Sequence, residues 1–124
     1  MTEKNIPSNE DFARAKAAMK KRDQGLSEVR SQVLNQFEAR GVHELFVFFS
    51  PASNCFGAYV FYDLNAQIDE AKRSGLSEEI ETAVLDALER VGRGRRSDLS
   101  VNFEFDSHEN VEKNYGGDYY DRLR

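Results

Sequence analysis

The side chains that most often carry catalysis or bind metals are few in this sequence. Its only histidines are His43 and His108, and its only cysteine is Cys55. A preorganised metal site needs several ligands at close spacing. We interpret the two histidines as lying outside any such site, so the sequence predicts no metal centre and no cofactor.

The turn Ser53-Asn54-Cys55 is the strongest candidate for nucleophilic chemistry. A hydroxyl or thiol becomes a nucleophile when an adjacent base takes its proton. Neither a G-x-S-x-G elbow nor a family-specific cysteine signature surrounds these residues. We interpret Cys55 as a small core residue of an apolar strand and expect the protein not to be an enzyme. A small enzyme that uses this turn stays as an alternative.

A basic loop, Gly92-Arg93-Gly94-Arg95-Arg96, combines glycines and cations in a way that superficially suggests a phosphate site. It contains no Walker lysine motif, and it follows a predicted helix where a P-loop would precede one. We interpret it as a solvated loop whose cations complement the C-terminal end of that helix. Contact of these arginines with RNA is the alternative.

The last segment, residues 107–124, interleaves carboxylates with tyrosines. Tyrosine supplies a large, rigid contact area at small entropic cost, and carboxylates steer and pair with a cationic partner. The predicted partner-binding residues are Glu104, Asp106, Glu109, Glu112, Tyr115, Asp118, Tyr119, Tyr120 and Asp121. The competing interpretation is a solvated extension, without helical period, whose tyrosines fold back onto the sheet.

The composition of the chain limits the number of domains and the classes of partner that are expected. A chain of 124 residues suits one domain, and 40% hydrophobic residues with 9 Phe and 5 Tyr can form its core. The net charge of -5 disfavours a general binder of nucleic acid or anionic membrane and favours a basic partner. Residues 1–7 lack the apolar region of a secretory signal, and no run reaches the roughly 18 apolar residues of a membrane span. We therefore expect a cytoplasmic protein.

Two N-terminal helices must precede the sheet. Phe12, Ala15 and Met19 recur at helical spacing, and Gly25 interrupts that helix. A second helix follows and stops at Gly41, in a typical position just after a helix end. We interpret the apolar stripe of each helix as core, and residues 1–8 as flexible.

Two strands and a helix pair follow. The unbroken apolar run Leu45–Phe49 is typical of a strand that is buried on both faces and hence central in its sheet. The run 56–62 comes after a short turn and should form an antiparallel hairpin with it. A short helix is expected over 65–74, and a longer one runs from Ser77 to just before Gly92.

The clearest strand pattern comes last. Val101, Phe103 and Phe105 alternate with polar residues, so we expect them to face the helices while Asn102 and Glu104 face solvent or a partner. Together the elements predict a single α+β domain, 1–124, with an antiparallel sheet of three or four strands and helices packed on one face.

This order of elements, with the segments LFVFF, FGAYVFY, VNFEFDSHENV and YGGDYYDRLR, resembles small bacterial immunity proteins, particularly the YezG-like group and those of contact-dependent inhibition. The resemblance covers residues 42–124. It implies a protein that is encoded beside a toxin and protects its producer by binding and blocking the toxin domain, often a nuclease. The two N-terminal helices and the arginine-rich loop depart from that group.

The expected function is therefore that of an immunity protein, which neutralises a toxin by occluding its active site or substrate surface. An acidic domain suits a basic nuclease, whose site presents Lys and Arg for phosphate. The partner is expected to be a protein, with no membrane and no nucleic acid. The main alternative is a housekeeping adaptor or regulatory module that docks a different protein through the same segment.

Overall fold

The structure is a computed structural model that describes residues 9–124. The prediction that residues 1–8 are flexible lies outside the described residues. The elements are α1 (Asn9–Arg22), α2 (Leu26–Phe37), η2 (Glu38–Arg40), β1 (Val42–Ser50), β2 (Cys55–Tyr62), α3 (Ala66–Ser74), α4 (Leu76–Arg90), η3 (Arg96–Asp98), β3 (Val101–Ser107), α5 (His108–Tyr115) and α6 (Tyr119–Leu123). They form an α+β fold with a three-stranded sheet, as predicted.

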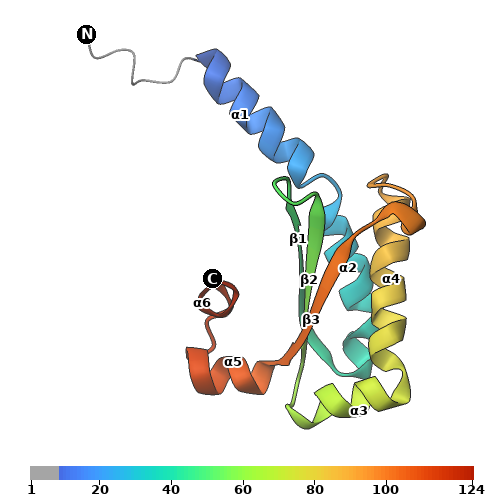
Figure 1. Cartoon of the computed structure of the whole chain (residues 1–124). Helices are drawn as coiled ribbons and strands as arrows, with labels where there is room; N and C mark the ends of the chain where they lie inside the picture. The colour runs from blue at the N-terminus through green and yellow to red at the C-terminus, as the bar shows by residue number, and fades with distance from the viewer. Residues whose placement is uncertain (1–8) are drawn as a thin grey trace.

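The sheet has the strand order β1-β2-β3. β1 and β2 form the predicted antiparallel hairpin, in which Phe46 lies opposite Tyr59. β3 instead runs parallel to β2, with Tyr59 opposite Glu104. The sheet is therefore mixed, and the expectation that every strand is antiparallel is wrong. The cause is the connection, because α4 carries the chain back along the sheet and β3 begins at the same end as β2 (Figure 1).

The apolar run Leu45–Phe49 lies on an edge strand, so the prediction that it is central is wrong; β2 is the central strand. Leu45 and Val47 are buried, as a central strand would require. Phe48 points to the other face and is 47% exposed. The run Leu45–Phe49 is apolar throughout because aromatic residues also occupy the other face of the strand, which is only partly covered.

The core lies between the sheet and the pair α2 and α4, which cover one face together (Figure 1). Apolar residues at i, i+4 spacing give each helix a single buried stripe. Phe37 from α2, Leu88 from α4 and Tyr62 from β2 are among the largest side chains in this core. The predicted apolar stripe of the second helix is therefore confirmed as core.

β3 presents its side chains as its alternation predicts. Val101, Phe103 and Phe105 pack against the core, and Asn102 and Glu104 are exposed on the opposite face. The three apolar residues are only half-buried, because β3 is an edge strand.

Gly25 separates α1 from α2, as predicted. Its φ of 77° lies in the left-handed region, and a Cβ at this position would lie 2.7 Å from Cγ2 of Val91. Only glycine therefore fits between the two helices at this packing distance.

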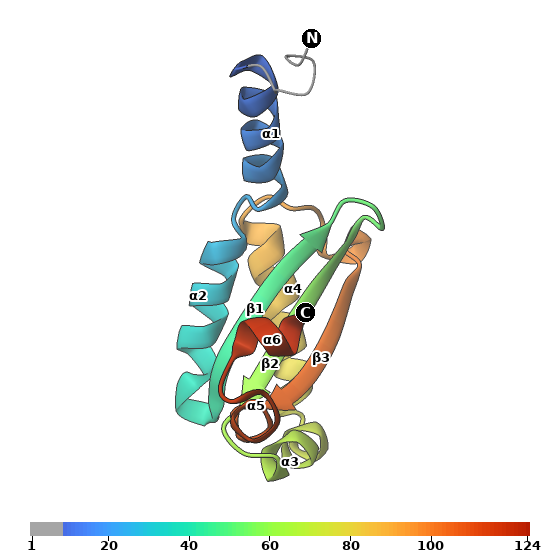
Figure 2. The same cartoon turned by 90° about the vertical axis from the view of Figure 1, so that its left-hand side faces the viewer.

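α1 projects from the domain, and no residue of this helix is buried (Figures 1 and 2). Phe12 is 61% exposed and Met19 is 54% exposed. The interpretation of its apolar stripe as core is therefore wrong. Within residues 9–124, α1 and every other helix is too short or too polar to act as a membrane span.

The C-terminal segment is helical, which its sequence did not predict. The hydroxyl of Ser107 accepts a hydrogen bond from the backbone N–H of Asn110 and caps α5, and Asp118 caps α6 in the same way. α6 returns over the sheet face opposite α2 and α4 (Figure 2). Helices therefore lie on both faces of the sheet, and the expectation of helices on one face is corrected.

Candidate functional site

The sheet face that points away from α2 and α4, called here the open face, carries rows of side chains across the three strands. The pleat and the strand register place these side chains together. From the β1–β2 turn downward the rows are Phe48, Gly57 and Asn102; Phe46, Tyr59 and Glu104; and Glu44, Phe61 and Asp106.

α6 covers the row farthest from the turn. The ring of Tyr119 packs edge-on against Phe61 with 4.9 Å between centroids, and it contacts Phe46 at 5.6 Å. The guanidinium of Arg122 lies 5.8 Å from the centroid of Phe61. Phe61 is fully buried as a result, so this part of the face is a small second core.

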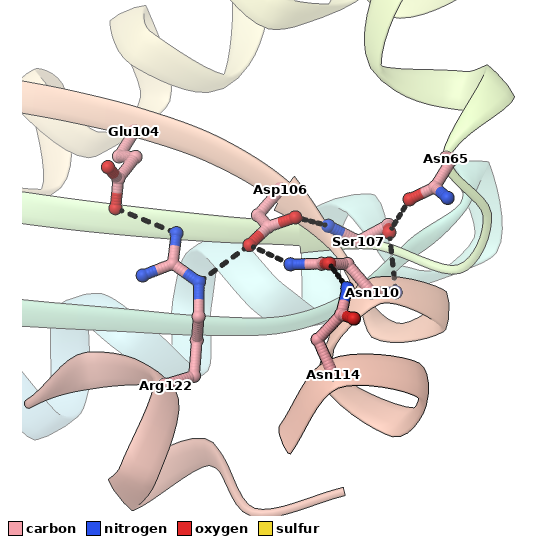
Figure 3. Close-up of polar contacts among 7 residues, drawn as sticks. All are labelled: Asn65, Glu104, Asp106, Ser107, Asn110, Asn114 and Arg122. Atoms are coloured by element: carbon pink, nitrogen blue, oxygen red, sulfur yellow. Dashed lines mark hydrogen bonds and ion pairs between the residues drawn. The ribbon is translucent and has the colours of Figure 1, made fainter. Parts of the chain in front are cut away.

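Arg122 ties α6 to β3 (Figure 3). Its Nε donates to a carboxylate oxygen of Asp106 at 2.7 Å, and its Nη2 donates to Glu104 at 3.0 Å. Partial burial lowers the pKa of Arg122, but the hydrogen bonds to the two carboxylates outweigh this and raise it. Asp106 also accepts from Nδ2 of Asn110 at 3.0 Å. Its carboxylate is thus held within the fold by several donors.

A groove lies over the rows nearest the turn, and its lining contains no residue of α6. Gly57 has no side chain to fill the centre of the sheet at this point, and the ring of Phe48 forms one wall. Glycine within a strand often marks a place where a ligand or another backbone approaches closely. The groove has a volume of about 410 Å³, and its lining on the open face includes Phe48, Ser53, Cys55, Tyr59, Asn102 and Glu104.

Cys55 lies in this groove and is half-exposed, so its interpretation as a core residue is wrong. Its sulfur accepts hydrogen bonds from Nδ2 of Asn102 at 3.1 Å and from the hydroxyl of Ser100 at 3.7 Å. Neither partner is a base that could take the thiol proton. The turn Ser53-Asn54-Cys55 therefore has no assembled nucleophile within residues 9–124.

The two histidines meet at the other end of the sheet, a contact that the sequence did not predict. Their rings stack with 3.8 Å between centroids. Nδ1 of His43 lies 2.9 Å from a carboxylate oxygen of Asp63, and Nε2 of His108 lies 3.1 Å from Glu112. The i, i+4 spacing of His108 and Glu112 is the sequence signal that marks the second pair. In the part of the chain that the structure describes, no group of three or more ligand residues could hold a metal ion.

The predicted partner-binding residues separate into two sets. Those held within the fold are Asp106, Tyr119, Glu109, which accepts from the backbone N–H of Asn65, and Asp118, which caps α6. Glu104, Glu112 and Asp121 are exposed and each pairs with a neighbouring side chain. Tyr115 is half-buried, and Tyr120 is 75% exposed. Asp106 and Tyr119 could meet a partner only if α6 moved, whereas the exposed carboxylates and Tyr120 are accessible as they stand.

The arginine loop is not simply solvated. Nη1 of Arg93 donates to the backbone carbonyls of Arg22 and Gln24, each at 2.8 Å, and its guanidinium lies 5.0 Å from the ring centroids of Phe49 and Phe56. Arg96 pairs with Asp86 of α4 at 2.9 Å. The solvated-loop interpretation is thus corrected for these two arginines, whose side chains join parts of the fold.

The open face with its groove is the candidate site. It offers aromatic walls, carboxylates and no assembled catalytic group among the described residues, an arrangement suited to binding. No family model, no curated protein and no solved structure matches the chain.

Proposed function

We propose that this protein is an immunity protein that binds a cognate bacterial toxin domain through the open face and neutralises it. The observation that carries the proposal is the groove over Gly57, where Phe48 stands exposed beside Tyr59 and Glu104. An exposed aromatic wall with carboxylates at its border has the composition of a protein-binding hot spot.

The electrostatics support a basic toxin such as a nuclease. The chain has a net charge of -5, and the carboxylates of Glu104, Glu112 and Asp121 are exposed around α6. Such a surface attracts the Lys and Arg side chains with which a nuclease holds phosphate. Inhibition is by occlusion: an apolar side chain of the toxin enters the groove, while the surrounding carboxylates pair with its cations and exclude nucleic acid.

The test uses the toxin domain encoded beside the gene for this chain. Co-expression of the chain with that domain should restore growth of the host, and the purified proteins should form a 1:1 complex. Gly57→Val should abolish both, because the added side chain fills the groove. A Cβ at Gly57 meets only Cε2 of Tyr59 at 3.5 Å, an ordinary contact, so the variant should still fold.

The matched control is Ala66→Val, which places the same final side chain at an exposed position of α3. It should protect the host like the wild type. Absence of protection by the wild-type chain would overturn the immunity proposal. Protection that survives in a folded Gly57→Val variant would overturn the assignment of the groove.

A further inference from the structure

α1 contributes no buried residue to the domain, and its charge is opposite to that of the rest of the chain. Its 14 residues carry five cationic side chains and two carboxylates, a net charge of +3. Residues 23–124 carry 19 carboxylates and 11 cationic side chains, a net charge of -8. The exposed rings and chains of Phe12, Ala15 and Met19 form an apolar stripe along this basic helix.

Contacts at the C-terminal end of α1 hold this helix so that it projects away from the domain (Figure 1). Arg93 donates to the carbonyls of Arg22 and Gln24, where α1 ends, and the same guanidinium lies over Phe49 and Phe56. Gly25 adds the close approach to Val91. α1 therefore cannot fold down onto its own open face without breaking this junction, and its stripe is offered to another molecule.

The open face matches α1 in both chemistry and charge. Its groove exposes the ring of Phe48, which suits Phe12 or Met19. The adjoining residues 101–124 carry six carboxylates against three cationic side chains, which suits the five cations of α1. We propose that α1 of one copy lies on the open face of a second copy, and that the exchange is reciprocal.

A second copy is the favoured occupant because the partner of a basic helix must be acidic, and the domain of this chain is acidic. The basic toxin of the proposed function would repel α1. Reciprocal exchange also gives a closed two-fold dimer with two identical contacts, and once one contact forms the second becomes intramolecular. If the open face also binds the toxin, which rests on the proposed function, the exchanged helix covers that face until the toxin displaces it.

Cys55 provides a direct test because it is the only cysteine and lies in the groove. In Ala15→Cys, a thiol is added to the apolar stripe while Phe12 and Met19 are kept. Mild oxidation of the full chain should produce a disulfide between position 15 of one copy and Cys55 of the other, seen as a covalent dimer and mapped by mass spectrometry. The yield should fall several-fold in about 0.5 M NaCl, because salt screens the charges.

The control is the double variant Ala15→Cys, Cys55→Ser, which removes the groove thiol and should form no covalent dimer after oxidation. A covalent dimer of this control would show that two α1 helices pair with each other and would overturn the proposal. A disulfide within one chain would overturn it too. Sedimentation of the wild type as a monomer at about 100 µM in low salt, with or without binding to anionic vesicles, would do the same. None of these measurements involves a toxin.

Discussion

The phenol oxygen of Tyr119 lies 2.6 Å from Nδ1 of His108, and this contact joins α6 to the first residue of α5. Nε2 of the same imidazole faces Glu112 at 3.1 Å. This network assigns the tautomer in which Nε2 carries the proton and the phenol donates to Nδ1. In this tautomer the phenol proton lies in the contact that joins α6 to α5.

The first prediction concerns alkaline pH. Burial, followed by the nearby charge of Glu44 and other carboxylates, raises the pKa of Tyr119 to about 12. Since an ordinary phenol has a pKa of about 10, the folded state holds this proton more tightly than the unfolded chain. The stabilisation is fully present below pH about 10 and is lost as pH rises towards about 12.

Absorbance at the tyrosinate band, followed against pH, checks this prediction. Subtraction of the Tyr119→Phe titration from that of the wild type should leave a component that rises only near pH 12. A component already centred near pH 10 would show that α6 does not cover the phenol.

The second prediction concerns Arg122. Replacement by Met keeps much of the packing on Phe61 but leaves Asp106 without its charged donor. We expect a loss of about 1.5–3 kcal/mol in the free energy of unfolding, the usual value of hydrogen bonds to charged groups. Arg122→Lys should recover only part of it, because an ammonium cannot reach both carboxylates with the same fork geometry.

Urea denaturation measures these losses, and Arg124→Met is the matched control. Arg124 pairs with Asp121 on the exposed side of α6, so its loss should change stability by less than about 0.5 kcal/mol. Equal effects of the two variants would mean that the Arg122 clamp does not form.

The third prediction concerns Arg93, which holds the base of α1. Arg93→Gln removes a charged donor to the carbonyls of Arg22 and Gln24 and a cation–π contact with Phe49 and Phe56. We expect amide hydrogen exchange over residues 22–26 to quicken at least tenfold, while the rest of the fold stays intact. Arg95→Gln is the control, because the Arg95 side chain makes no hydrogen bond or ion pair with residues 9–124. An unchanged rate of amide hydrogen exchange over residues 22–26 in Arg93→Gln would show that Arg93 does not hold the base of α1.

The fourth prediction compares two phenylalanines of the core. Phe37 is 2% exposed, so Phe37→Ala should cost about 3–5 kcal/mol. Phe103 is only half-buried on the edge strand β3, and Phe103→Ala should cost less, about 1–3 kcal/mol. Urea denaturation of the two variants gives both losses, because at an equal dependence of the unfolding free energy on urea the midpoints rank the stabilities. A larger loss for Phe103→Ala would show that β3 is covered.

The sequence predicted the α+β class, the hairpin and the facing of β3, because each depends on local periodicity and on turn residues. Phe103 and Phe105 alternate with polar neighbours, and Gly25 and Gly41 stand where helices end. The parallel pairing of β3 was missed, since it depends on how the α3–α4 connection returns, which no local pattern records.

The site was harder to predict than the fold. Alternation placed Glu104 on the open face, but the groove depends on Gly57 lying between Phe48 and Asn102 on neighbouring strands. Nothing in the sequence indicated that Tyr119 is packed on the sheet while Tyr120 is exposed. Capping by Asp118 sets the rotation of α6, and a helix of five residues is too short to show a period that would separate its buried and exposed sides.

The last prediction separates these two tyrosines in binding to the toxin domain of the proposed function. Tyr120 is 75% exposed, whereas Tyr119 is packed on Phe61. Tyr120→Ala should leave the melting temperature unchanged and raise the dissociation rate of the complex about 10- to 100-fold, because it deletes an exposed aromatic anchor.

Asp121→Asn should instead slow association, and more so at low salt, because the charge acts mainly by steering. Tyr119→Ala should lower the melting temperature, so any effect on binding comes with a loosened α6. Surface plasmon resonance gives both rates for each variant. Wild-type rates in a folded Tyr120→Ala would exclude α6 from the interface and confine the partner to the groove around Gly57.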